Sequence, residues 1–311
     1  MKNRSISTTQ LAKICGVSQG TVDRALNNRE GINRDTKEKV LRVAKQYGYR
    51  PKTRVKTVWD GRSHLIGVVV FNLDNPYFSD FLTRIEKLCS KNGYSTVVMF
   101  THTDGQREIE CIDSLYHMNV DGIVISPVNT GEEFENYLLS LEIPIVTIAN
   151  KLERIPYIGI DNNSAMRNTV EYVLNCGYDR LIYVKPDLNN SDFSFAQKER
   201  LNAFCDLLNK NDVEFAVCEH ENAERELNLK KRNAYICAND FTAIRVYSFA
   251  KRNNAGIIGF DNVDLIDLCD FKLDSVFYDV KATAASVMQY LINGKLDNTP
   301  IPFKIIKRGS I

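Results

Sequence analysis

A polar segment near the N-terminus, GVSQGTVDRALNNREG at residues 16–31, carries side chains that suit contact with nucleic-acid bases. Its few apolar residues, Val22, Ala25 and Leu26, have helical spacing and need to be buried on one face only. The outer face of this helix holds small, polar and charged residues, which are Gln19, Gly20, Thr21, Asp23 and Arg24. Arginine pairs with guanine and glutamine with adenine through two hydrogen bonds in the major groove of DNA. The segment therefore predicts a helix that enters this groove.

One further helix is expected before this one and another after it. The segment STTQLAKICG begins with hydroxyl side chains that can cap a helix, and Gly16 ends it. The segment INRDTKEKVLRVAKQYGYRP predicts a third helix, capped at Asn33 and ended by Gly48, and Pro51 prevents it from resuming. Two short helices across a tight turn, with a third behind them, describe a helix-turn-helix domain.

Basic residues are concentrated in the N-terminal part of the chain. The first 60 of the 311 residues hold 14 Lys and Arg against 5 Asp and Glu, and the others hold 26 against 34. The net charge of +1 therefore hides a basic head on an acidic body. This asymmetry favours a polyanionic partner for the head, although a solvated basic arm fits the charge alone equally well.

From Leu65 onward, short apolar strands alternate with amphipathic helices. The expected strands are LIGVVVF, STVVMFT, GIVISP, IPIVTIA, RLIYVKP, EFAVCE, AYICAND and AGIIGFD. The expected helices lie around residues 77–92, 106–118, 131–141, 163–175, 196–210 and 240–253. This alternation predicts an α/β fold with parallel sheets covered on both faces, whereas the polar segment 218–234 is a doubtful helix. A break near Ile160–Asp161 predicts two sheets, with a ligand between their carboxyl edges.

Several classes of function lack their sequence signatures. The chain has no GxGxxG after the first strand, no GxxxxGK[ST] and no GxSxG, and its four histidines are isolated. Its eight cysteines form no CxxC pair, so we expect reduced thiols and neither a zinc cluster nor a disulfide framework. We therefore expect no catalytic residue, no cofactor and no metal. Neither a signal peptide nor a membrane-spanning apolar run is found, so we expect a cytoplasmic protein.

The segment from TTQLAKICGVSQGTVDRALNN to the end of GYRP resembles, without gaps, the DNA-binding domain of the LacI/GalR family of transcriptional regulators. The resemblance implies that Gln19, Gly20 and Arg24 read bases, whereas Thr9 and Thr21 hold phosphates. The whole set of DNA contacts that it implies is Thr9, Ser18, Gln19, Gly20, Thr21, Asp23, Arg24, Asn27, Arg54 and Val58. The usual form of this family's second helix is VSxxTVSRxLN, so Asp23 replaces a serine. Asp23 could accept from a cytosine amino group, pair with Arg24 or restrain non-specific affinity.

The polar linker at residues 52–63 corresponds to the segment that, in the family, folds into a hinge helix only on operator DNA. RVKTV at residues 54–58 is similar to the family's xARSL, which places Val58 where a leucine is wedged into the minor groove. Valine is a smaller wedge, and a plain flexible tether is the alternative.

The remainder, residues 64–311, resembles the family's periplasmic-binding-protein-like sensor through NPYF, IGIDN, ERLNAF, ANDFTAI and IIGFDN. The resemblance implies a cleft lined by Tyr77, Phe78, Asp161, Ser194, Arg200, Asn239 and Asp261. These groups suit a sugar, because carboxylates accept from hydroxyls, Arg and Asn donate, and an aromatic face covers the ring. The two aspartates would also hold Arg200, and Ala196 stands where a hydroxyl residue is often found. As alternatives, the aspartates could cap helices, Arg200 could form a core ion pair, and the aromatic residues could simply pack.

These observations lead to one expected organisation. Residues 1–51 form the helix-turn-helix domain, residues 52–63 the hinge, and residues 64–311 a two-lobed domain for ligand binding and dimerisation. Its first lobe would hold residues 64–160 plus a late crossover segment, and its second lobe residues 161–281 plus the C-terminus. The expected function is a transcriptional repressor on pseudo-palindromic operator DNA, controlled by a carbohydrate effector, as a homodimer or tetramer. The alternatives are a doubly wound enzyme that acts on a sugar-like substrate and a sugar-binding protein without a DNA function.

Overall fold

The computed structural model describes residues 6–26, 29–47, 49, 61–186, 195–268 and 271–311. The chain forms two compact units, Met1–Gly61 and Arg62–Ile311, which are described separately below. Among the described residues, no helix is both long and apolar enough to cross a membrane. Within those ranges, the cysteines are free thiols.

The first unit is a bundle of three helices, α1 (Thr8–Cys15), α2 (Gln19–Leu26) and α3 (Arg34–Gln46). Ser7 and Gln10 form a capping box at the start of α1, and Gly16 ends this helix in the left-handed conformation with φ 68°. Ser18, directly before α2, accepts a hydrogen bond from the backbone amide of Thr21 at 3.1 Å. The bundle buries a small core, which consists of Leu11, Ala12, Cys15, Val22, Ala25, Val40 and Ala44. The predicted helix-turn-helix architecture is confirmed.

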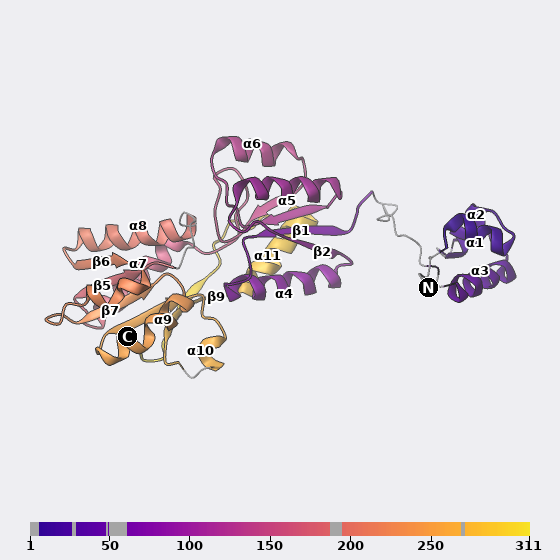
Figure 1. The fold of residues 1–311 in the computed structure, drawn as a ribbon. Coiled ribbons are helices and arrows are strands. Elements are labelled where there is room, and N and C mark those ends of the chain that lie inside the picture. The colour runs from indigo at the N-terminus through magenta and orange to yellow at the C-terminus, as the bar shows by residue number, and fades with distance from the viewer. Residues whose placement is uncertain (1–5, 27–28, 48, 50–60, 187–194, 269–270) are drawn as a thin grey trace. The chain divides into compact units, whose positions relative to one another are not determined.

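The second unit contains a first sheet with strand order β2-β1-β3-β4. Its strands are all parallel and comprise β1 (Leu65–Val70), β2 (Ser95–Phe100), β3 (Gly122–Ile125) and β4 (Ile145–Thr147). Its helices are α4 (Pro76–Lys91), α5 (Gly105–His117), α6 (Glu132–Ser140) and, late in the chain, α11 (Val280–Asn293). Helices α5 and α6 cover one face and α4 and α11 the other (Figure 1), so β1, β3 and β4 are buried between two layers, whereas the edge strand β2 is partly exposed.

A second sheet follows with strand order β10-β9-β8-β7-β5-β6. Its strands are β5 (Arg180–Val184), β6 (Glu214–Cys218), β7 (Asn233–Cys237), β8 (Gly256–Phe260), β9 (Asp274–Tyr278) and β10 (Phe303–Ile306), and β10 alone among them runs antiparallel. One face packs against α7 (Asn162–Asn175) and α8 (Phe195–Lys210), the other against α9 (Asp240–Arg252). The short α10 (Leu265–Leu268) and a 3₁₀ helix, η1 (His220–Glu226), complete this lobe.

The predicted α/β fold with parallel sheets is confirmed, with three differences in detail. Helices α10 and α11 were not among the six helices that we expected after Leu65. The structure has ten strands in its described part, because β9 and β10 add to the eight that we expected. The doubtful segment 218–234 contains the 3₁₀ helix η1 rather than an α-helix.

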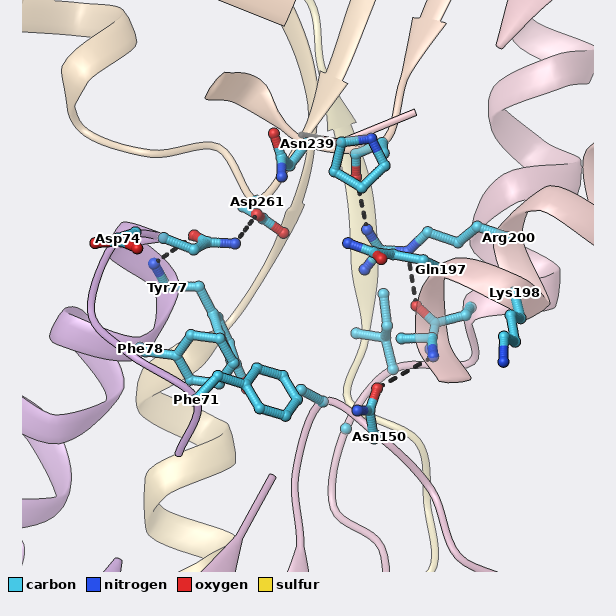
Figure 2. Close-up of a pocket in the computed structure, with 18 of the residues that line it drawn as sticks. Phe71, Asp74, Tyr77, Phe78, Asn150, Gln197, Lys198, Arg200, Asn239 and Asp261 are labelled. Atoms are coloured by element: carbon cyan, nitrogen blue, oxygen red, sulfur yellow. Dashed lines mark hydrogen bonds between the residues drawn. The ribbon is translucent and has the colours of Figure 1, made fainter. Parts of the chain in front are cut away.

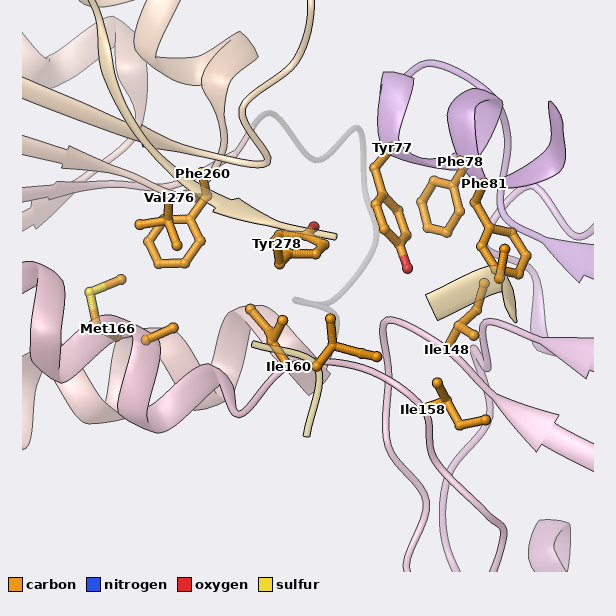
Figure 3. Close-up of a cluster of buried hydrophobic side chains, with 14 of the residues drawn as sticks. Tyr77, Phe78, Phe81, Ile148, Ile158, Ile160, Met166, Phe260, Val276 and Tyr278 are labelled. Atoms are coloured by element: carbon orange, nitrogen blue, oxygen red, sulfur yellow. The ribbon is translucent and has the colours of Figure 1, made fainter. Parts of the chain in front are cut away.

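A continuous apolar cluster joins the two lobes below the carboxyl ends of their strands (Figure 3). Tyr77 and Phe81 reach it from α4, and the ring of Tyr77 lies 5.6 Å from that of Tyr278 at the end of β9. Phe260 and Met166 belong to the same cluster on the side of the second lobe. The cluster therefore supports, from both lobes, the residues at the carboxyl ends of the strands.

Candidate functional site

A cavity of about 860 Å³ lies between the two lobes of the second unit. Many of its lining residues follow strands: Phe71, Asn72, Asp74 and Asn75 after β1, Pro127, Val128 and Thr130 after β3, Ala149 and Asn150 after β4, and Ala238 and Asn239 after β7. Parallel strands end at one edge of their sheet, so the segments that follow the strands of both lobes line the same cavity (Figure 2). Such crevices are the usual ligand sites of open α/β sheets, and this volume fits a small molecule.

Arg200 is the most strongly positioned charge of this cavity. It lies on α8, is only 7% exposed, and donates from Nε to Asn162 Oδ1 at 2.8 Å and from Nη1 to the Ala238 carbonyl at 3.0 Å (Figure 2). Its guanidinium also lies 4.2 Å from the ring centre of Phe260. We expected Asp161 and Asp261 to hold this side chain. Instead, an amide oxygen, a backbone carbonyl and an aromatic face fix it, which leaves guanidinium donors for a ligand.

Asp261 follows β8 and joins groups from both lobes. Its Oδ2 accepts from Asn75 Nδ2 of the first lobe at 3.0 Å, and its Oδ1 accepts from the Tyr278 hydroxyl at 2.7 Å. The backbone of Asp261 has φ 95°, a conformation that is uncommon for a residue with a Cβ atom. This carboxylate is therefore a hydrogen-bond acceptor that the surrounding structure holds at the cavity.

The other predicted ligand residues have different environments. Asn239 lines the cavity and caps α9, and its Oδ1 accepts from the Thr242 amide and hydroxyl, both at 2.9 Å. Asp161 is exposed, does not line the cavity and caps α7 through the Ser164 amide and hydroxyl, so the capping alternative fits its position. Ser194 lies outside the described residues.

The aromatic wall comes from α4. Tyr77 and Phe78 line the cavity, are nearly buried and pack edge-to-face with ring centroids 5.1 Å apart (Figure 2). Burial raises the pKa of Tyr77, and the nearby charge of Asp261 raises it as well, so the phenol stays protonated. Burial likewise raises the pKa of Tyr278. Both phenols can therefore act as neutral donors and acceptors at physiological pH.

Sequence reasoning missed several residues of this site. Asn150 is 4% exposed, donates to the Pro127 carbonyl at 2.8 Å and accepts from the Ala196 amide of the second lobe at 3.2 Å. Asn150 therefore joins the lobes through a hydrogen bond between neutral groups, to which Ala196 contributes its backbone amide. The missed lining residues also include Asp74, Asn75, Tyr157, Asn162, Gln197, Lys198, Arg245 and Tyr278. Asn75 and Asn162 lie inside the motifs NPYF and IGIDN, which could have indicated them.

In addition to this cavity in the second unit, the first unit carries a polar face on α2. Gln19 Nε2 donates to Thr9 Oγ1 at 2.7 Å, and the hydroxyls of Ser18 and Thr21 lie 2.9 Å apart. Gly20 and Arg24 are exposed, as a groove-reading surface requires. The structure also pairs Asp23 with Arg29, whose side chain Nη1 lies 3.2 Å from Asp23 Oδ2. The remaining predicted contacts, Asn27, Arg54 and Val58, lie outside the described residues.

In the parts of the chain that the structure describes, no three His, Cys, Asp or Glu side chains lie close enough together to bind a metal ion. The cavity instead offers a buried guanidinium, a carboxylate, amides and phenols beside aromatic rings. This combination can bind a polar molecule with several hydroxyl groups, since it supplies both donors and acceptors.

Comparisons with known proteins agree with this division of the chain. Residues 9–52 match the model of bacterial regulatory proteins of the lacI family, and residues 66–265 match a periplasmic binding protein domain. The transcriptional regulator PtxS of Pseudomonas plecoglossicida is 30% identical over 204 residues, which are 64% of this chain and 58% of that protein. Catabolite control protein A of Staphylococcus xylosus is 24% identical over 330 residues, 98% of this chain and 99% of that protein.

Solved structures share the fold. A lac repressor dimer bound to operator and to the anti-inducer ONPF has a TM-score of 0.78 at 18% identity, over 98% of both chains. A periplasmic binding protein/LacI transcriptional regulator of Alkaliphilus metalliredigens, complexed with D-xylulofuranose, has a TM-score of 0.66 at 23% identity over 78% of this chain and 97% of that one. With a lacI-type helix-turn-helix ahead of a two-lobed binding domain, this chain belongs to the LacI family of bacterial regulatory proteins.

Proposed function

We propose that this protein represses transcription from a pseudo-palindromic operator and that a sugar or sugar derivative controls its affinity for that DNA. The observation that carries the effector part is the buried Arg200, which is fixed by neutral partners at the wall of a cavity of about 860 Å³. Family membership supports the regulatory part, and in this role the protein acts in the cytoplasm. The related regulators are not named as enzymes, and we propose no catalytic role for the cavity.

A carbohydrate fits the donors and acceptors of the cavity better than an apolar ligand does. Arg200 would donate to ring or hydroxyl oxygens, and Asp261 would accept from a pair of hydroxyls. Tyr77 and Phe78 would cover the C–H face of the ring, and Asn239 would add its amide. A related structure contains D-xylulofuranose, which supports this class of ligand without naming the sugar.

Control of DNA binding would arise from the bonds between the lobes. Asn75 and Asp261 are hydrogen-bonded across the cavity, and Asn150 bonds to the backbone of Ala196. An effector that takes over the Asp261 carboxylate would exchange these contacts for its own and thereby select one arrangement of the lobes. In a homodimer, this selection would change how two heads engage two half-sites.

The proposal is tested by a thermal-shift screen of the full-length protein against a library of monosaccharides, disaccharides and sugar acids. A ligand that binds only the folded state raises the melting temperature. At a concentration of a hundred times Kd, it adds about 2.7 kcal/mol to the free energy of unfolding. We expect a sugar to do so, and the same sugar to change the affinity for DNA selected from a random duplex library. Enzymatic turnover of the sugar, or the absence of both effects, would contradict the proposal.

A further inference from the structure

We propose that Arg29 is a further DNA contact of the head, which binds a backbone phosphate, and that Asp23 is the residue that positions it. The proposal rests on the proposed DNA binding of α2. Its starting observation is the ion pair between Arg29 Nη1 and Asp23 Oδ2 at 3.2 Å.

Asp23 lies on the face of α2 that points away from the bundle. Val22 and Ala25 on either side of it are buried against the other helices. Gly20 and Arg24 are exposed, and Asp23 neighbours Gly20 on the helix surface because residues three apart lie on one face. The carboxylate therefore lies on the stripe that would face the groove.

An isolated carboxylate at this place would oppose DNA binding. Duplex DNA carries a dense row of phosphates, and a negative charge brought close to it is repelled. The ion pair with Arg29 cancels this charge locally. The backbone amide of Arg29 also donates to the Arg24 carbonyl at 3.0 Å, which attaches Arg29 to the end of the helix that carries Asp23.

The pair does more for binding than for folding. The side chains of Arg29 and Asp23 are 54% and 49% exposed, and ion pairs at such exposure add little to the stability of a fold. A carboxylate does, however, restrict the orientation of a guanidinium, which keeps other N–H groups free to donate. Asp23 thus reduces the conformational freedom that Arg29 would lose on binding.

The position of Arg29 favours a phosphate over a base. In helix-turn-helix domains, the N-terminal residues of the second helix contact base edges. Arg29 lies beyond Leu26, the last residue of α2, and so at the opposite end from Gln19. At that end the wall of the groove, which is made of phosphates, is the nearer partner.

The test compares four full-length proteins, the wild type, Arg29→Ala, Asp23→Asn and the double variant, on duplex DNA that the wild type selects from a random library. We expect Arg29→Ala to weaken binding about tenfold on all sequences alike. The salt dependence should become shallower by about 0.9 for each phosphate that the variant no longer binds. Asp23→Asn should weaken binding about twofold when Arg29 is present and strengthen it when Arg29 is absent, since the carboxylate then repels the phosphates and no longer orients Arg29.

The ion pair Arg34–Glu38 on α3 provides the matched control, with an N–O distance of 3.1 Å. Glu38→Gln should change DNA affinity in the same direction with and without Arg34. The proposal is overturned if Asp23→Asn strengthens binding in both backgrounds, if Arg29→Ala leaves affinity unchanged, or if it relaxes preference at a single base pair. Failure of the wild type to select any duplex would instead overturn the proposed function together with this inference.

Discussion

Replacing Arg200 by alanine should separate the binding of an effector from the binding of DNA. The side chain is 7% exposed and donates to Asn162 and to the Ala238 carbonyl, so both acceptors lose their partner in the variant. Each buried acceptor left without a partner costs about 1–3 kcal/mol, so the two together predict a destabilisation of about 2–6 kcal/mol. The second unit should still fold, because its cores remain intact.

The loss of effector affinity should be larger than destabilisation alone explains. Each charge-assisted hydrogen bond from the guanidinium to the effector is worth about 1.5–3 kcal/mol. Removing one of them therefore weakens effector binding by about tenfold to a hundredfold, and removing two weakens it by up to about ten thousandfold. DNA affinity without effector should stay nearly unchanged, because the head is a separate compact unit.

The assay is titration calorimetry of the folded variant with the sugar found in the thermal-shift screen. Arg180→Ala is the control, because Arg180 lies in the same lobe, its side chain is 12% exposed, and it donates to the Glu226 carbonyl at 2.8 Å outside the cavity lining. Arg180→Ala should destabilise the protein but keep effector affinity. If Arg200→Ala loses no more affinity than this control, Arg200 is only a structural residue.

Three further predictions concern single contacts. Arg24→Ala should cost about 1–3 kcal/mol of DNA affinity and relax base preference at one position per half-site in a binding-site selection; equal loss on all sequences would mark a phosphate contact instead. Asn75→Ala removes the hydrogen bond to Asp261 across the cavity and also the N-cap of α4, so effector affinity measured by calorimetry should change while stability falls by about 1 kcal/mol, and an unchanged affinity would argue against competition for this carboxylate. Burial raises the pKa of Asp240 well above its ordinary value of 3.8, so its folded state holds the proton more tightly than the unfolded state. Wild-type stability should therefore fall relative to Asp240→Asn as the pH rises from about 4, and parallel urea-unfolding curves at all pH values would contradict this sign.

Much of the fold followed from local patterns in the sequence. Caps such as Ser7 and Asn33 and the left-handed Gly16 act within one turn of their own helix, which makes α1 and α3 readable from the sequence. Strands such as β7 and β8 are buried on both faces and therefore read as continuous apolar runs. Strand β10 was missed because FKII is short, lies at an edge of its sheet and is only half buried.

The site was predictable where a residue belongs to a motif and acts through its own side chain. Asp261, Arg200 and Asn239 line the cavity, as the resemblance implied. The predicted partners of Arg200 were wrong: Asp161 caps α7, Asp261 bonds to Asn75 and Tyr278, and Asn162 accepts from the guanidinium instead. The Asn150–Ala196 contact and the Asp23–Arg29 pair join residues of different segments, and neither spacing nor composition encodes such contacts.

The most direct test of the account measures both binding reactions on one protein. The affinity for a fluorescent duplex of selected sequence is determined by anisotropy with and without the sugar, and the affinity for the sugar is determined with and without that duplex. If the two sites are coupled, the sugar changes DNA affinity and the DNA changes sugar affinity by the same factor. Two affinities that are each measurable but independent of one another would contradict the account.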